Sequence, residues 1–470
     1  MASNLTSMRL ADCMDAIIDY RGKTPTKTTS GIPLITAKII KNGRIQDVNE
    51  YIAEDDYDAW MRRGIPKEGD VVLTTEAPLG EVAQLDSRKI ALAQRVITLR
   101  GKKGVLDNDY LLYLLQSHDV QHQLDGRGTG STVKGIKQSE LKEIILSFPS
   151  INAQKRIAQH LKNIDNKITL NRQINQTLEQ MAQTLFKSWF VDFDPVMDNA
   201  LDAGSPIPDE LQHRVEARKA VRESEGFKPL PDDVRQLFPD AFEESELGWV
   251  PKGWVVSNLS TLIDIKHGFA FKGEHFSDKE TSEILLTPGN VKIGGGFKAD
   301  KFKYYDGPIE DNYVFSVGDM FVTMTDLSKA SDTLGYPAIV PDLSGKRLHH
   351  NQRLGKVLFS DHPASKEMFV YHNLCSTKYR QSVVGSATGT TVKHTAPKKI
   401  LAHTVVHTPD GLLESEFERQ TSAFKKMAAA NDKSTNTLTK LRDTLLPKLI
   451  SGELRLDDVE AAVEQETVSA

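Results

Sequence analysis

Two short stretches of the chain concentrate hydroxyl groups, backbone N–H groups and a lysine. They read TGSTVK at residues 129–134 and TGTTVK at residues 388–393. In each, a glycine-hinged turn can expose N–H groups, the hydroxyls add donors, and the closing lysine adds positive charge, which together suit a nucleic-acid phosphate. A competing structural role for the hydroxyls is to cap the helices predicted at KQSELKEI and APKKIL. The candidate phosphate ligands are Thr129, Ser131, Thr132, Lys134, Thr388, Thr390, Thr391 and Lys393.

Neither stretch matches a nucleotide-binding loop, and no other catalytic motif is present. A nucleotide-binding phosphate loop requires Gly, four residues, and then Gly-Lys followed by Ser or Thr. Lys134 follows Val133 instead of a glycine, and Lys393 deviates in the same way. The sequence also lacks His-Glu-x-x-His, Gly-x-Ser-x-Gly and the Asn-Pro-Pro-Tyr type of tetrapeptide that amino-methyltransferases use. We therefore expect no catalytic residue, no metal site and no activity of this chain alone.

The composition indicates a globular protein with more than one domain. A chain of 470 residues exceeds what one core usually organises, and 39% hydrophobic with 26% charged residues argues against disorder. No apolar run approaches the roughly 20 residues that span a bilayer, so a cytoplasmic protein without membrane contact is expected. The only cysteines, Cys13 and Cys375, cannot build a zinc site. The net charge of −5 averages over faces that can differ in sign, so it does not exclude DNA binding.

The segments around the two stretches repeat in the same order along the chain. GDVVLT in the first half matches GDMFVT in the second, for example, and AQRV matches NQRL. The displacements lie between about 250 and 260 residues, as small loop insertions would produce, and they indicate an internal duplication. The matched ranges are 32–45 with 284–297, 69–74 with 318–323, 77–83 with 332–338, 93–96 with 351–354, and 114–117 with 373–376.

Each half is predicted to contain a mixed α/β globule of about 150 residues, a usual domain size. The apolar runs are short and β-branched, and Gly, Asp and Pro separate them, which is typical of strands and turns. DYLLYLLQS and EMFVYHNLCS have the pattern of short helices. The predicted fold class is therefore mixed α and β, with two similar globules and a pseudo-two-fold repeat.

A heptad pattern follows each globule. Alternating steps of four and three residues select positions that are apolar at both ends and polar in the middle, and the two series lie 260 residues apart. A helix of about 33 residues would be about 50 Å long and needs a partner. We expect an antiparallel coiled coil whose central amides fix the register; alternatively, each helix packs on its own globule. The seam residues are Ile157, Leu161, Ile164, Ile168, Asn171, Leu178, Leu185 and Trp189, then Phe417, Phe424, Asn431, Leu438, Leu445 and Leu449.

Together these features resemble the specificity subunits of Type I restriction–modification enzymes. The resemblance covers nearly the whole chain. It is carried by the GD-(V/M)-(V/F)-(L/V)-T strand with its following LG, and by the GST/GTTVK loop leading into LKEIILSFPSINAQKRIAQHLKNIDNKI. The segments FKSWFVDFDP and LRDTLLPKLISGELRL add to it. PDGLLESEFERQ departs from the PPL-x-EQ pattern of the family, which PSINAQKRI follows better.

The resemblance implies that each globule reads one half of a split DNA sequence while the helices set the unread gap between the halves. It implies target-recognition domains at 1–153 and 250–410, coiled-coil helices at 154–190 and 411–454, a linker at 191–249, and a disordered tail at 455–470. From composition alone, the proline-rich linker is a connector with one short helix at DELQHRVEARKAV.

The resemblance also implies partners. Besides double-stranded DNA, these would be two methyltransferase subunits, which bind S-adenosylmethionine and methylate adenine, and restriction subunits, which use ATP and Mg²⁺ for translocation and cleavage. No cofactor is expected in this chain, and the host would be a bacterium or an archaeon. Two alternatives from other classes are a non-catalytic coiled-coil scaffold with ligand-binding globular domains and a hydrolase built on the Ser/Thr-rich loops.

Residues that contact bases do not follow from the resemblance, so they are chosen by their chemistry. Arg and Lys can pair with guanine, Asn and Gln with adenine, and Ser or Thr with either. For every candidate, a solvated surface role is the competing interpretation. The candidates are polar residues at predicted loop or strand ends: Lys38, Lys41, Arg44, Thr75, Gln94, Arg95, Arg127, Asn290, Lys292, Thr325, Lys329, Gln352, Arg353 and His394.

Overall fold

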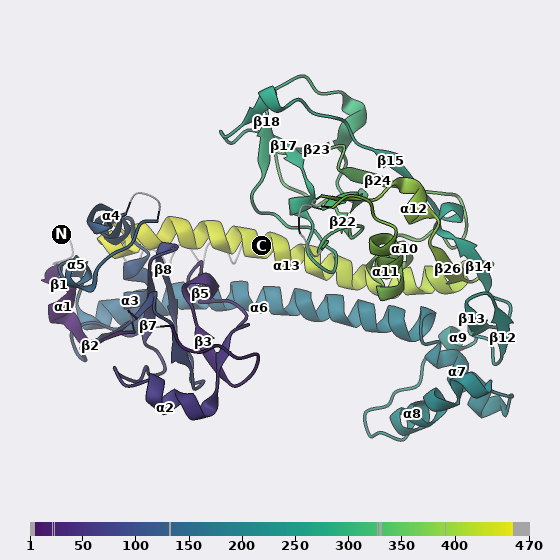
Figure 1. Ribbon diagram of the computed structural model, residues 1–470, viewed down its shortest axis with the longest axis horizontal. Coiled ribbons are helices and arrows are strands. Elements are labelled where there is room, and N and C mark those ends of the chain that lie inside the picture. Colours follow the sequence, from purple (N-terminus) through teal and green to yellow (C-terminus); the bar gives the residue numbers. More distant parts are fainter. Residues whose placement is uncertain are drawn as a thin grey trace. The chain divides into compact units, whose positions relative to one another are not determined.

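The computed structural model describes residues 5–20, 22, 24–130, 133–326, 328, 331–390 and 392–454 (Figure 1). The chain divides into two compact units, Met1–Gln173 with Asp432–Ala470, and Ile174–Asn431. The tail predicted at 455–470 lies outside the described residues. In the described part of the chain, no helix is both long and apolar enough to cross a membrane.

The first unit mixes short helices and strands. Its strands are β1 (Thr6–Arg9), β2 (Met14–Asp19), β3 (Ile32–Ile35), β4 (Ile40–Lys41), β5 (Arg44–Ile45), β6 (Tyr51–Ile52), β7 (Val71–Thr75), β8 (Leu79–Gln84), β9 (Ala91–Leu92), β10 (Val96–Gly101) and β11 (Ile145–Phe148). Its short helices are α1 (Leu10–Cys13), α2 (Tyr57–Trp60), α3 (Asn108–Leu115), α4 (His118–Arg127) and α5 (Gln138–Lys142), and α6 (Ile151–Phe190) begins in it.

The main sheet of the first unit is antiparallel, in the order β2-β10-β7-β8. Strand β7 is buried throughout, and its side chains alternate between two cores: Leu73 packs with Leu99 in one, and Val72 packs with Val96 in the other. A run of consecutive apolar residues suits a strand that is covered on both faces, which is why VVLT forms the centre of this sheet.

The second unit contains the remaining elements. Its strands are β12 (Phe242–Ser245), β13 (Gly248–Pro251), β14 (Val255–Asn258), β15 (Ile263–His267), β16 (Phe276–Ser277), β17 (Glu283–Leu286), β18 (Lys303–Tyr305), β19 (Val314–Phe315), β20 (Met320–Thr323), β21 (Thr325–Asp326), β22 (Pro337–Ile339), β23 (Arg347–His350), β24 (Leu354–Phe359), β25 (Lys393–His394) and β26 (Thr404–His407). Its helices are α7 (Asp194–Ala203), α8 (Gln212–Arg222), α9 (Asp232–Arg235), α10 (Glu367–Cys375), α11 (Thr377–Gly385) and α12 (Pro397–Leu401), and α13 (Leu412–Ser451) begins in it.

The two units repeat the same topology. The sheet β15-β24-β20-β22 of the second unit has the order of β2-β10-β7-β8, strand for strand. The pair β14–β26 repeats β1–β11, and the parallel pair β17–β23 repeats β3–β9. The helices α10, α11 and α12 follow in the order of α3, α4 and α5. The predicted duplication is therefore present in the fold.

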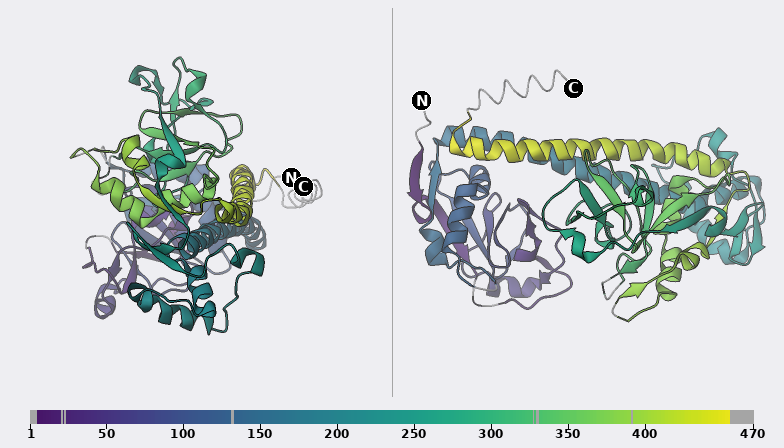
Figure 2. Two further views of the ribbon diagram at one scale, coloured as in Figure 1. Left: turned by 90° about the vertical axis from the view of Figure 1, so that its right-hand side faces the viewer. Right: turned by 90° about the horizontal axis from the view of Figure 1, so that it is seen from above.

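Helices α6 and α13 run antiparallel and lie side by side within each unit (Figure 2). In the first unit Asp165 bonds Arg442 and Asn171 bonds Ser434; in the second, Asn175 bonds Asn431. Within each unit, the residue number of the α13 partner falls as the residue number on α6 rises, so the two helices run in opposite directions. Every predicted seam residue is buried or half-buried. The alternative in which each helix packs only on its own globule does not hold.

The ends of the two helices differ from the predicted bounds by a few residues. Helix α6 begins at Ile151, three residues early, because the Gln154 side chain ties its first turn to the Asp107 N–H and the Val105 carbonyl at 2.9 Å each. Helix α13 ends at Ser451, before the predicted 454, because Gly452 has a φ of 72°, a left-handed conformation that favours glycine after a helix.

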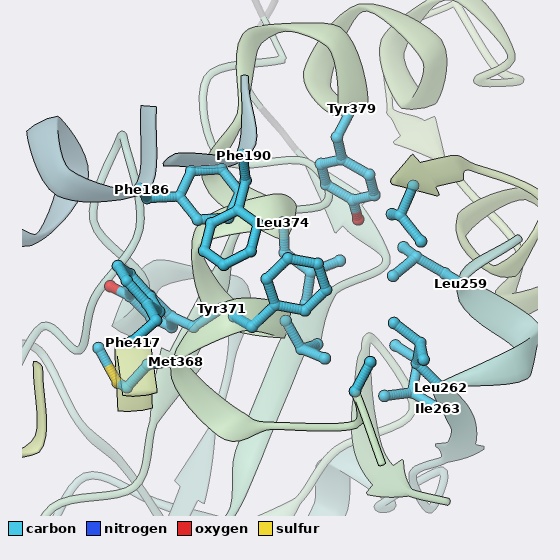
Figure 3. Close-up of a cluster of buried hydrophobic side chains, with 14 of the residues drawn as sticks. Phe186, Phe190, Leu259, Leu262, Ile263, Met368, Tyr371, Leu374, Tyr379 and Phe417 are labelled. Carbon is cyan, nitrogen blue, oxygen red and sulfur yellow. The ribbon is translucent and has the colours of Figure 1, made fainter. Parts of the chain in front are cut away.

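An aromatic core joins α6, α10 and α13 in the second unit (Figure 3). The ring centroids of Phe186 and Phe190 lie 5.9 and 5.5 Å from that of Phe417, and Phe190 lies 4.8 Å from Phe369. Edge-on aromatic pairs of this kind contribute about 0.5–1.5 kcal/mol each beyond the area they bury. The last turns of α6 are therefore held firmly in the second unit.

The linker is more ordered than predicted, since it contains three helices and the hairpin β12–β13. Its prolines start helices instead of only breaking them, as Pro195 does in the first turn of α7. Three of the ion pairs between α7 and α8 join residues 20 positions apart: Asp194–Arg214 at 3.4 Å, Asp198–Arg218 at 2.5 Å and Asp202–Arg222 at 2.5 Å. This constant offset shows that α7 and α8 run parallel.

Candidate nucleic-acid interface

The two hydroxyl-rich loops are closed by the same backbone bridge. In the first unit, Thr129 and Gly135 exchange two backbone hydrogen bonds of 2.8 and 2.9 Å. In the second unit, Thr388 and His394 exchange two of 2.9 Å. Each bridge joins residues six positions apart, so the loops share one closed geometry as well as one sequence pattern.

A glycine is required at the second position of each loop. Gly130 has a φ of 117° and Gly389 a φ of 96°, in the region that L side chains rarely adopt. A Cβ at Gly130 would collide with the carbonyl oxygen of Val133, and one at Gly389 with that of Val392. The glycine hinge predicted from the sequence therefore allows the chain to turn back on itself.

Each loop docks on the end of the central strand of its unit. The N–H of Ile136 donates to the carbonyl of Thr75 at 3.0 Å, and the N–H of Thr75 donates to the carbonyl of Arg95 at 3.0 Å. This arrangement brings the loop, the strand end and the AQRV segment to one edge of the first unit.

The second unit repeats this docking with its own residues. Thr395 N–H donates to the Met324 carbonyl at 3.0 Å, and Met324 N–H donates to the Arg353 carbonyl at 2.8 Å. In addition, the Thr325 hydroxyl lies 3.1 Å from Nδ1 of His394. Loop, strand end and the NQRL segment again meet at one edge.

The competing capping role of the hydroxyls is not seen. The N-cap residues of α5 and α12 are Lys137 and Ala396, and neither helix has a side-chain capping bond. Thr129, Thr388 and Thr390 are exposed. Ser131, Thr132 and Thr391 lie outside the described residues. The described hydroxyls are thus available to a ligand.

Exposure divides the remaining candidates into three groups. Lys38, Lys41, Arg95, Lys134, Lys292, Gln352, Arg353 and His394 are exposed, and Arg44, Gln94, Arg127 and Lys393 are half-buried. Thr75, Asn290 and Thr325 are buried. Lys329 lies outside the described residues.

Three candidates have structural roles that count against base contact. The buried Asn290 amide accepts from the Thr287 N–H at 2.9 Å and donates to two carbonyls of its own loop. Thr75 is 2% exposed at the strand end. Arg44 points to α6, where its Nη2 donates to the backbone carbonyl of Asp165 at 3.2 Å. Base contact at these three positions stays a prediction, and their burial or internal bonds count against it.

Sequence reasoning missed one polar cluster at the helix pair. Asp165 of α6 accepts from Tyr113 Oη at 2.9 Å and from Arg442 Nη1 at 3.0 Å. Asp165 adjoins the seam position Ile164, so the heptad pattern treats it as a surface residue. An arginine on the seam at position 442 is the signal that could have indicated a buried acidic partner.

The buried histidines add no positive charge to a DNA-binding surface. Burial lowers the pKa of His350, His372 and His403 to about 4, so their rings are neutral at physiological pH. Within the described residues, no group of three or more His, Cys, Asp or Glu side chains could hold a metal ion. The positive charge near the loops therefore comes from lysine and arginine.

The chain matches known proteins over nearly its whole length. Residues 5–180 match the family described as the Type I restriction modification DNA specificity domain. The Type I restriction enzyme MjaIX specificity subunit of Methanocaldococcus jannaschii is 25% identical over 433 residues, 91% of this chain and 88% of that protein. The HindI specificity subunit of Haemophilus influenzae is 26% identical over 425 residues, 83% and 87% of the two chains. The chain is related to Type I specificity subunits.

A solved structure establishes the shared fold. The S subunit of the Type I restriction–modification system from M. genitalium aligns with a TM-score of 0.52 over 95% of this chain and 96% of that chain, at 14% identity. The predicted resemblance to Type I specificity subunits is therefore confirmed, as is the predicted fold class of mixed α and β units with long helices.

Proposed function

We propose that the chain is the DNA sequence-recognition subunit of a Type I restriction–modification complex and reads a bipartite target, one half-site per globular unit. The observation that supports this most directly is the duplicated loop, closed by the same bridge and docked on the same strand end in both units. A protein that carries the same reading element twice suits a target made of two half-sites.

Each unit would divide its contacts between phosphates and bases. The loop hydroxyls, its backbone N–H groups and Lys134 or Lys393 suit phosphate oxygens, which position the protein without reading sequence. The Gln-Arg pairs, at 94–95 and 352–353, adjoin the docked loops. Arginine pairs best with guanine and glutamine with adenine, so these pairs are the strongest candidates for base contacts.

The helix pair would act as a spacer and as the docking surface for two methyltransferase subunits. A helix of 40 residues is about 60 Å long, which exceeds the roughly 34 Å of one turn of DNA. Four large apolar side chains of the described residues are exposed along the pair, Leu170 and Met181 on α6 and Leu412 and Met427 on α13. Exposed apolar residues on such helices suit a protein partner.

The chemistry would belong to the partner subunits. In this proposal S-adenosylmethionine binds to the methyltransferase subunits, while ATP and Mg²⁺ serve the restriction subunits, and this chain has no catalytic role. A subunit that works on cellular and incoming DNA would act in the cytoplasm of a bacterial or archaeal cell. The scaffold alternative is not favoured, because the relatives are specificity subunits.

The decisive experiment is to map methylated adenines made by the assembled methyltransferase complex with and without this chain. We expect two short half-sites at a fixed gap, and loss of methylation at those sites when the chain is omitted. Methylation of the same sites without the chain would contradict the proposal.

Salt dependence separates DNA recognition from the scaffold alternative. Binding that neutralises phosphates releases counterions, so affinity should fall steeply between low and high salt. An affinity for DNA that does not respond to salt would count against the phosphate-binding role of the loops.

A further inference from the structure

Asp165 connects four elements of the first unit. Its carboxylate accepts from Tyr113 in α3 and from Arg442 in α13, at 2.9 and 3.0 Å. Its backbone carbonyl accepts from Arg44 in β5 at 3.2 Å, and Nη2 of Arg44 also lies 3.7 Å from the carboxylate. Asp165 itself belongs to α6, so this residue joins both long helices to the globule.

The surroundings make these bonds stronger than surface contacts. The Asp165 side chain is 22% exposed, those of Arg44 and Arg442 are 23% and 18% exposed, and Tyr113 is 1% exposed. Hydrogen bonds to a charged group are stronger than neutral ones, and partial burial limits screening by solvent. A single carboxylate thus fixes three partners.

The contacts lead from Asp165 to the docked loop. Arg44 lies in the β4–β5 hairpin, whose Gly43 bridges Ala83 in β8. Strand β8 pairs with β7, and the end of β7 at Thr75 accepts the N–H of Ile136, just after the loop. A rotation of the globule about the helices would therefore have to break the bonds at Asp165, together with the Lys162–Asp109 ion pair of 2.8 Å.

We infer that Asp165 is a positioning residue that fixes the angle of the first globule on the helix pair and so the gap at which its half-site is accepted. This inference rests on the proposed function. Loss of the carboxylate would let the globule swing, which relaxes the selection of the gap. The bases read by the globule would stay the same, because the loop and strand edge are unchanged.

The test measures gap selection by the complex assembled with its methyltransferase subunits. The probes are duplexes with the mapped half-sites and a gap of native length or one base pair shorter or longer. We expect Asp165→Asn to lower the ratio of methylation rates, native gap over altered gap, by about tenfold, which corresponds to ~1.4 kcal/mol. Tyr113→Phe, which removes one hydrogen bond and keeps the ring, should lower it by a smaller factor.

Asp443→Asn is the matched control. Asp443 also bonds Arg442, at 2.7 Å, but its side chain is 59% exposed and this ion pair lies within α13. Its ratio should equal that of the wild type. Unchanged ratios in Asp165→Asn and Tyr113→Phe would overturn the inference, as would a change in half-site preference as large as the change in gap selection.

The outcomes for the two proposals are distinguishable. A wild-type complex without any half-site preference would overturn the proposed function. A wild-type complex with half-site and gap preference, both kept by the variants, would overturn only the positioning role. If Asp165→Asn does not fold, the ratio for Tyr113→Phe decides: a lowered ratio supports the inference, and a wild-type ratio overturns it.

Discussion

Lys134 shows how a single exposed side chain can serve DNA binding without serving the fold. Its ammonium lies 2.6 Å from Asp125, an exposed ion pair that contributes little to stability, so a phosphate can replace the aspartate at small cost. We expect Lys134→Ala to weaken DNA binding without changing base preference. The slope of log affinity against log salt should become shallower by about one.

Competition binding on variant duplexes measures the base preference, and the same measurement at several salt concentrations gives the salt slope. Lys103→Ala removes another exposed lysine, in the turn after β10, and serves as the charge-matched control. A shift in base preference in Lys134→Ala would contradict the assignment of this lysine to phosphate.

Gly130 allows a second prediction, on the shape of the loop. A Cβ at this position meets the Val133 carbonyl, and the φ of 117° is unfavourable for alanine. We expect Gly130→Ala to open the loop and to weaken DNA binding by more than Lys134→Ala does. Gly126→Ala is the control, since Gly126 lies in α4 with open space around its Cα. Equal binding by both glycine variants would contradict the role of the loop.

His372 gives a prediction on pH. Its ring lies 5.7 Å from Phe186, and neither ring nitrogen has a hydrogen-bond partner. Burial lowers its pKa to about 4 in the folded chain, whereas an unfolded histidine has a pKa of about 6.5. Above about pH 6.5 the ring is neutral in both the folded and the unfolded chain, and the folded state keeps its full stability. As the pH falls toward 4, the unfolded chain binds a proton that the folded chain does not, so the free energy of unfolding decreases.

Chemical unfolding at several pH values tests this prediction. The free energy of unfolding should fall below about pH 6.5, with a contribution from His372 of up to ~3 kcal/mol near pH 4. His350 and His403 act in the same direction, so the decisive quantity is the difference from His372→Leu, which should lose less stability on acidification. Identical pH profiles for the wild type and His372→Leu would contradict the prediction.

Side-chain type alone could not show which of the candidate base-contacting residues are exposed. Asn290 and Thr75 have suitable chemistry, yet Asn290 bonds its own loop and Thr75 is buried at a strand end. Nothing in a single sequence separates these from exposed residues such as Arg95. The role of the loop glycines was easier to predict, because a glycine inside a hydroxyl-rich turn usually allows the backbone conformation of the turn.

At the scale of elements, the long helices could be predicted to within three residues because their heptad pattern continues for many turns. In the linker, the short helix predicted at DELQHRVEARKAV is confirmed as α8, but α7 was not predicted, because ion pairs to residues 20 positions later hold it. Periodic apolar patterns do not record such contacts. Prolines that start helices also look like helix breakers in a sequence.

The amides at the centre of the helix pair should be energetically coupled. Asn431 Nδ2 donates to Asn175 Oδ1 at 2.9 Å, and Asn175 Nδ2 donates to the Ala428 carbonyl at 3.1 Å. A hydrogen bond of this kind contributes about 1 kcal/mol. A double-mutant cycle with Asn175→Ala and Asn431→Ala should therefore give a coupling energy of about 1 kcal/mol, measured by chemical unfolding.

Coupling near zero would mean that each amide is satisfied independently. Gln176→Ala provides a control next to the pair, since Gln176 lies on the same helix at an exposed position outside the seam. Its cycle with Asn431→Ala should show no coupling.

At the scale of the whole molecule, the duplication and the family could be predicted from ordered matches between the halves. The contacts that we infer to hold a globule at its angle on the helices, such as that of Asp165 with Tyr113, could not be predicted. Asp165 and Tyr113 lie 52 positions apart in the sequence, so no local pattern indicates their contact.

The spacer role predicts a change in the gap. Four residues inserted into α6 near Asn171, with a matching insertion in α13, should lengthen the pair by about 6 Å and the recognised gap by about one to two base pairs. Both half-sites should stay the same in methylation mapping. Four residues inserted after Glu223, past the end of α8, should change nothing. An altered half-site with an unaltered gap would contradict the spacer role.

The first unit combines two segments that lie far apart in the sequence. Leu449 and Ile450 of α13 belong to the same core as Ile157 and Leu161 of α6. During synthesis, the N-terminal part leaves the ribosome first, but its core is complete only after the last turns of α13 have emerged. The second unit, continuous from Ile174 to Asn431, can be complete earlier. A chain that stops before the last turns of α13 would therefore leave Ile157 and Leu161 without the apolar side chains of Leu449 and Ile450.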